Sequence, residues 1–80
     1  MVLEKTHSLV LLNDDENSYT YVMRCLITYC DHSREQAEQC AIIAHNNGKC
    51  NIKEGSLDSI IDLKFELAAT SLKVEIESLV

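Results

Sequence analysis

An apolar run of strand length stands directly before a cluster of short polar side chains near the start of this 80-residue chain. The run covers Ser8 to Leu12 and is apolar on both faces, which predicts a central strand beneath a layer of helices. Asn13, Asp14 and Asp15 follow, and such side chains bond nearby backbone N–H groups in turns and helix caps. The change from apolar to polar residues therefore predicts that the first strand ends at Leu12.

This polar cluster has two interpretations. As a binding site, two carboxylates beside an amide would accept hydrogen bonds from a cation. As a structural feature, Asp14 and Asp15 would only cap the next helix and suit the positive charge at its N-terminal end. The local pattern alone favours capping, and the two roles can coexist.

Length and charge limit the classes of function. A chain of 80 residues forms one domain with a modest core, too small for a large enclosed active site. Its formal charge of −6 argues against a nucleic-acid partner and suits a cationic ligand or a basic patch on a partner protein. No apolar stretch approaches the length of a membrane span, and the N-terminal residues lack a signal-peptide core. We therefore expect a cytoplasmic protein with no membrane partner.

The four cysteines lack the spacing of a metal site or a disulfide framework. No C-x-x-C pair occurs among Cys25, Cys30, Cys40 and Cys50, so we expect small buried thiols. Zinc would need clustered thiolate and imidazole ligands. The sequence predicts no metal and no cofactor.

The middle of the chain has the pattern of two helices. Apolar side chains at steps of three or four over residues 19–30 predict a helix with one buried stripe, which Asn17 or Ser18 can cap. A capping box of Ser33 and Gln36 starts a second helix, which is expected to end at about His45 or Asn46. Gly48 beyond it can adopt the left-handed conformation. Small residues on the second helix allow close approach to another helix or to a ligand. The predicted inward residues are Val22, Cys25, Leu26, Tyr29, Ala37, Cys40, Ala41 and Ala44.

The remainder predicts a strand, a helix and a strand. Residues 49–53 alternate like a half-buried strand, and Glu54-Gly55 is expected to be a turn. Ser56 should cap a third helix, and residues 72–77 alternate like a final strand. The predicted inward residues are Leu57, Ile60, Ile61, Phe65, Leu67, Ala68, Leu72, Val74 and Ile76.

The order of these elements is β-α-α-β-α-β. It predicts an α+β fold in which a single small domain has a three-stranded antiparallel sheet with helices packed on one face. We expect a short N-terminal tail over residues 1–7 and a core domain over residues 8–78.

Two motifs stand in register on this element order. Asn13-Asp14-Asp15 follows the first strand, and His45 closes the second helix before Gly48-Lys49. With these motifs the chain resembles the ClpS family, adaptors that hand substrates to a Clp AAA+ protease. The resemblance extends from about Ser8 to Glu77. Within that range, the further residues that match the family are Leu12, Tyr21-Val22, Glu38-Gln39 and Ala44 to Asn47.

The resemblance implies an adaptor and not an enzyme, with no catalytic residue. It would bind the free N-terminal residue of N-degron substrates, large hydrophobic or aromatic, and deliver them to a Clp AAA+ unfoldase. Asn13, Asp14 and His45 would bind the α-amino group, and Asp15 would support it directly or through water. The pocket for the first side chain would have Asn17 at its rim and would be lined by Tyr19, Val22, Ala41 and Ala44. On the third helix, Asp58 and Lys64 would be candidates for docking on the N-terminal domain of the unfoldase.

Some positions depart from the family pattern. The family often has proline and then methionine where this chain has Ser18 and Tyr19, and a second methionine corresponds to Ala41. These changes leave the preferred N-terminal residue open. One alternative is a ClpS-like interaction domain that docks on a Clp unfoldase or another partner without N-degron recognition. Another is a small enzyme using His45 with Asp14 or a cysteine, which is disfavoured because no cysteine lies in a context that activates a thiol.

Overall fold

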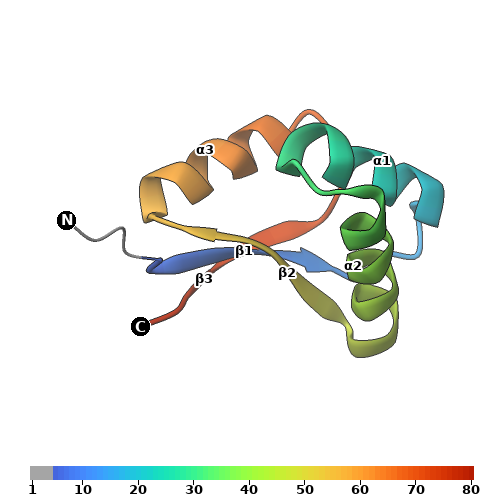
Figure 1. The fold of residues 1–80 in the computed structure, drawn as a ribbon, viewed down its shortest axis with the longest axis horizontal. Coiled ribbons are helices and arrows are strands. Elements are labelled where there is room, and N and C mark those ends of the chain that lie inside the picture. Colours follow the sequence, from blue (N-terminus) through green and yellow to red (C-terminus); the bar gives the residue numbers. More distant parts are fainter. Residues whose placement is uncertain (1–4) are drawn as a thin grey trace.

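The computed structural model describes residues 5–80. The three strands in this range form an antiparallel sheet in the order β2-β1-β3. Helices α1 and α3 lie across one face of the sheet, and α2 stands at its end beside β2 (Figure 1). The elements are β1 (His7–Leu12), α1 (Tyr19–Cys30), α2 (Arg34–Asn47), β2 (Lys49–Gly55), α3 (Leu57–Leu67) and β3 (Val74–Ser78). The predicted α+β fold and element order are confirmed.

The first strand is central, as its apolar run predicts. Leu9 and Leu11 join the core beneath the helices. Val10 points to the opposite face, yet it is only 2% exposed because it lies between Asn51 of β2 and Glu75 of β3. Residues 1–4 of the expected N-terminal tail lie outside the described residues, and β1 begins at His7, one residue before the predicted start.

The helix boundaries follow the predicted capping signals. Ser18 caps α1 and Ser56 caps α3, each accepting a hydrogen bond from a backbone N–H in the first turn. Ser33 and Gln36 form the reciprocal capping box at the start of α2. Gly48 ends α2 with a φ of 92°, the left-handed conformation that glycine adopts without a steric penalty.

The end of β2 and both ends of β3 also differ from the prediction. Glu54-Gly55, expected as a turn, extends β2 because these residues pair with Ser8 and His7 of β1. Ladder pairing between distant segments thus overrides the local turn preference. The last strand begins at Val74, so Leu72 precedes it, although Leu72 is buried as predicted.

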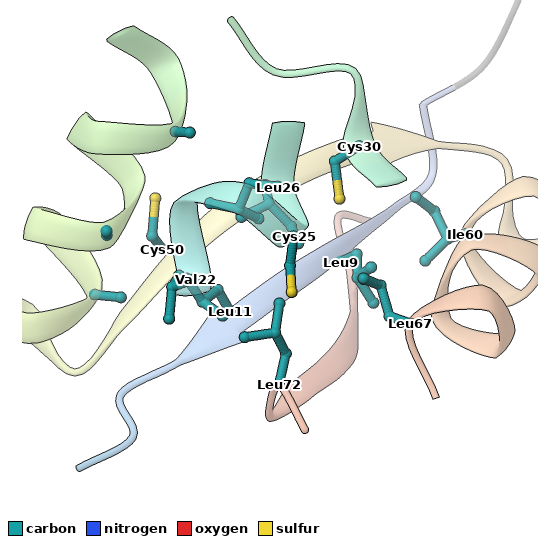
Figure 2. Close-up of a cluster of buried hydrophobic side chains, with 14 residues drawn as sticks. Leu9, Leu11, Val22, Cys25, Leu26, Cys30, Cys50, Ile60, Leu67 and Leu72 are labelled. Atoms are coloured by element: carbon teal, nitrogen blue, oxygen red, sulfur yellow. The ribbon is translucent and has the colours of Figure 1, made fainter. Parts of the chain in front are cut away.

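The hydrophobic core lies between the sheet and the helices (Figure 2). Three cysteine side chains are buried in it, Cys40 is half-buried, and all four are free thiols. Val74 and Ile76 are half-buried against it. The buried members are Leu9, Leu11, Val22, Cys25, Leu26, Cys30, Ala37, Ala41, Ala44, Cys50, Ile52, Ile60, Leu67 and Leu72.

Several side chains predicted to be buried are exposed. On α3 only Ile60 and Leu67 are buried, and Phe65 is 82% exposed. A helix that crosses a narrow sheet covers it with one stripe, so side chains farther round the helix face outward. At the end of α1, Cys30 takes the inward place predicted for Tyr29. The corrected positions are Tyr29, Leu57, Ile61, Phe65 and Ala68. Within residues 5–80, no helix is long and apolar enough to cross a membrane.

Candidate functional site

A cavity of about 230 Å³ opens where the end of β1 meets the start of α1 and the end of α2. It is smaller than the roughly 300–1,000 Å³ typical of cofactor pockets, so its size suits a single amino-acid side chain. Every residue predicted to bind the substrate contributes to its lining. These residues are Asn13, Asp14, Asp15, Asn17, Tyr19, Val22, Ala41, Ala44 and His45.

A backbone hydrogen bond holds the acidic loop, residues 13–17, against the end of α2. The N–H of Asn13 donates to the carbonyl oxygen of Gly48 at 2.8 Å. Gly48 in turn donates its N–H to the carbonyl of Ala44 at 2.9 Å, which closes the helix. The left-handed turn at Gly48 therefore brings Asn13 and His45 to the same cavity.

The carboxylate of Asp14 accepts hydrogen bonds from within the protein itself. Its Oδ1 accepts the backbone N–H of Glu16 at 2.8 Å, and its Oδ2 accepts a hydrogen bond from the side-chain amide of Asn17. Lys73 Nζ lies 3.9 Å from Oδ1, and the Asp14 side chain is only 4% exposed. The N–H of Asp14 donates to Asn13 Oδ1 at 2.9 Å, the turn bond expected of an Asn.

The capping interpretation of the acidic pair is wrong, since Ser18 supplies the cap of α1. Asp15 is exposed, and its carboxylate makes no hydrogen bond or ion pair with the described residues. His45 lies in the last turn of α2, and its ring packs edge-on against Tyr19 with centroids 5.6 Å apart. Oxygen and imidazole acceptors thus form the polar part of the cavity lining.

Another part of the cavity lining is apolar. Val22 comes from α1, and Ala41 and Ala44 come from α2. These side chains are buried, and the two alanines leave the wall with little bulk. The arrangement can therefore hold a ligand that joins a cationic group to an apolar side chain.

Some lining residues were missed by the sequence prediction: Leu11, Leu12, Ser18 and Leu72. Leu72 reaches the cavity because β3 pairs antiparallel with β1, and the N–H of Leu12 donates to the carbonyl of Lys73 at 2.8 Å. No local pattern signals that pairing. The predicted docking residues Asp58 and Lys64 lie exposed on α3, outside the cavity lining.

The thiols of Cys30 and Cys40 resist ionisation. Burial raises the pKa of Cys30 from its ordinary 9.0 to about 11, although Lys53 acts in the opposite direction. Burial, with a hydrogen bond to Cys50, raises the pKa of Cys40 to about 12. Activated cysteine nucleophiles have lowered values instead. Across the described part of the chain, no three His, Cys, Asp or Glu side chains are grouped to hold a metal ion.

The fold of this chain occurs in a known protein structure. No curated protein matches the chain. A solved structure, Agrobacterium tumefaciens ClpS2 bound to L-phenylalaninamide, has a similar fold with a TM-score of 0.73 at 23% sequence identity. The similarity covers 92% of this chain and 96% of that one. The family model of the ATP-dependent Clp protease adaptor protein ClpS matches residues 3–75. The chain therefore belongs to the ClpS family, whose members are adaptors and not enzymes.

Proposed function

We propose that the protein binds the free N-terminal residue of N-degron substrates when that residue is large and hydrophobic or aromatic. It then delivers these substrates to a Clp AAA+ unfoldase. The observation that carries this proposal is the cavity in which acceptors for a cation border an apolar wall. L-Phenylalaninamide, the molecule bound in the similar ClpS2 structure, joins a free amine to a benzyl group. That chemistry suits both sides of the cavity.

The polar side of the cavity supplies acceptors for an ammonium group. An N-terminal ammonium has three N–H donors, and a carboxylate, an amide oxygen and a neutral imidazole can all accept them. Asn13, Asp14 and His45 carry these groups, and Asp15 adds a second carboxylate at the rim. Charge-assisted hydrogen bonds contribute about 1.5–3 kcal/mol each.

The apolar side binds the first side chain. Burying a Leu or Phe side chain against Val22, Ala41 and Leu72 contributes roughly 1.5–3 kcal/mol. Together with two or three bonds to the ammonium, and less the cost of association, this gives affinity on the order of 1 μM. Affinity of that order lets an adaptor release its substrate.

Delivery requires a second contact, with the N-terminal domain of the unfoldase. Asp58 and Lys64 on α3 are our candidates for it, because both are exposed and lie outside the cavity. Substrate and unfoldase could then bind at the same time.

The test of the proposal is a pair of peptides that begin with Phe and differ only in N-acetylation. Fluorescence anisotropy should detect binding of the free-amine peptide alone. Acetylation removes the charge and leaves the acceptors of the site desolvated without donors. Equal affinity for the two peptides would contradict amine recognition. Failure of both to bind, with retained binding to an unfoldase N-terminal domain, would favour an interaction domain that does not read N-terminal residues.

A further inference from the structure

The turn between α3 and β3 touches the acidic loop through side chains that the family resemblance does not assign. Residues 71–73 of this turn lie beside the cavity, and Leu72 lines it. Its neighbours Ser71 and Lys73 contact Asn17 and Asp14 instead. The turn is therefore placed to act on the cavity through the acidic loop.

Asn17 and Ser71 form a reciprocal pair. The Ser71 hydroxyl donates to Asn17 Oδ1 at 2.8 Å, and the Asn17 side-chain amide donates to the Ser71 carbonyl at 3.2 Å. The same amide group gives its other hydrogen to Asp14 Oδ2. The hydrogen-bonding capacity of the amide is thus shared between the turn and the carboxylate. Ser71 thereby sets the orientation in which Asn17 meets Asp14.

Lys73 lies near the same carboxylate. Its ammonium lies 3.9 Å from Asp14 Oδ1, and its side chain is 55% exposed. The Asp14 side chain is only 4% exposed, but the Lys73 ammonium faces solvent, which screens the pair, and its long side chain must be held in place. The substrate's α-ammonium carries the same charge and needs the same acceptor, so the two cations compete.

We infer that the α3–β3 turn sets the strength of amine binding: Ser71 positions Asp14 through Asn17, and Lys73 competes with the substrate ammonium for Asp14. The inference rests on the proposed function of the cavity. Ser71 and Asn17 are positioning residues in this scheme. A carboxylate fixed before binding loses less conformational freedom when the ligand arrives, which strengthens binding.

The first experiment removes the hydroxyl of Ser71. We expect Ser71→Ala to weaken the binding of a peptide beginning with Phe about 3- to 10-fold, the effect of roughly one net hydrogen bond. Ser71→Thr keeps a hydroxyl and should restore most of the affinity. Ser78→Ala is the matched control, because among residues 5–80 that hydroxyl bonds only to Val80, far from the cavity lining. Unchanged affinity in Ser71→Ala, or a Thr variant as weak as the Ala variant, removes Ser71 from the scheme.

The second experiment removes the competing cation. We expect Lys73→Met to bind the peptide about 2- to 5-fold more tightly at low salt, with the gain shrinking as ionic strength rises. A folding defect cannot produce tighter binding, so this variant remains informative if Ser71→Ala folds poorly. Lys53→Met makes the same change in net charge away from the cavity and should show less gain. Equal gains in peptide affinity in the two variants would contradict competition between Lys73 and the substrate ammonium.

A measurement without peptide separates this inference from the proposed function. The side-chain amide resonances of Asn17 in the free protein should shift in Ser71→Ala and not in Ser71→Thr. If they do while no peptide binds the unmodified protein, the contact stands and N-degron recognition fails. If peptide binds but the resonances do not move, the positioning role of Ser71 is wrong.

Discussion

Ala41 gives the cavity a wall with almost no side-chain bulk. It lies between two other buried alanines of α2 and is 5% exposed. Space beside a small residue can be filled by a ligand, with a gain of roughly 0.8 kcal/mol for each buried methylene. Large aromatic N-terminal residues should therefore bind at least as well as Leu.

We predict that Ala41→Met narrows the cavity and weakens the binding of peptides beginning with Phe or Trp more than those beginning with Leu. The melting temperature should change little, because the added side chain enters a cavity. If Ala41 instead packs against α1, Met overfills the core and costs about 1–3 kcal/mol of stability. A lower melting temperature with an unchanged Phe-to-Leu affinity ratio would show that Ala41 is not part of the pocket wall.

The end of α2 connects fold and site at the scale of one element. Gly48 stops the helix, and its carbonyl accepts the N–H of Asn13. A Cβ added to Gly48 would meet no atom within 4 Å, so a larger residue is opposed by backbone conformation and not by contact.

We predict that Gly48→Ala lowers the free energy of unfolding by roughly 1–2 kcal/mol, the cost of a left-handed conformation for an ordinary L-residue. Gly48→Asn is the control, and it should lose less because Asn adopts this conformation more readily. Urea denaturation of the three proteins makes the comparison. Equal stability of Gly48→Ala and the unmodified protein would mean that the helix end relaxes into another turn.

Local signals predicted these elements well. Ser18, Ser33 and Ser56 each act within one helical turn, so the chain alone indicates where the helices begin. The predicted end of β2 was wrong because Glu54 pairs in the sheet with Ser8, a residue far away in the chain. On α3, the sequence alone does not show which apolar side chains reach the sheet, because that depends on the width of the sheet. Phe65, predicted to be buried but exposed in the structure, is the clearest example.

The cavity depends on contacts that span the whole molecule. Resemblance to a family, and not periodicity, led to the residues from Asn13 to His45 that line it. The turn residue Ser71 lies 54 positions from its partner Asn17, so nothing near either residue indicates their hydrogen bonds. Antiparallel pairing of β3 with β1 brings these segments together.

Because thiols are buried, the stability of the whole domain varies with pH in the alkaline range. Cys30 is 4% exposed, and burial raises its pKa from 9.0 to about 11. Between these values the unfolded chain loses the thiol proton while the folded chain keeps it. The unfolded state then binds fewer protons, so stability falls as pH rises. This contribution is fully present below pH 9 and is lost progressively up to about pH 11.

We predict that the free energy of unfolding decreases between pH 9 and about pH 11, with Cys30 contributing at most about 1.4 kcal/mol per pH unit. Cys40 acts in the same direction. Cys30→Ala should be less stable at pH 7, because it leaves a cavity, yet its stability should decline less steeply with pH. Urea denaturation of both proteins at pH 7, 9 and about 10.5 measures the two slopes. A slope in Cys30→Ala as steep as in the unmodified protein would show that other groups cause the alkaline loss and that the buried thiol does not resist ionisation.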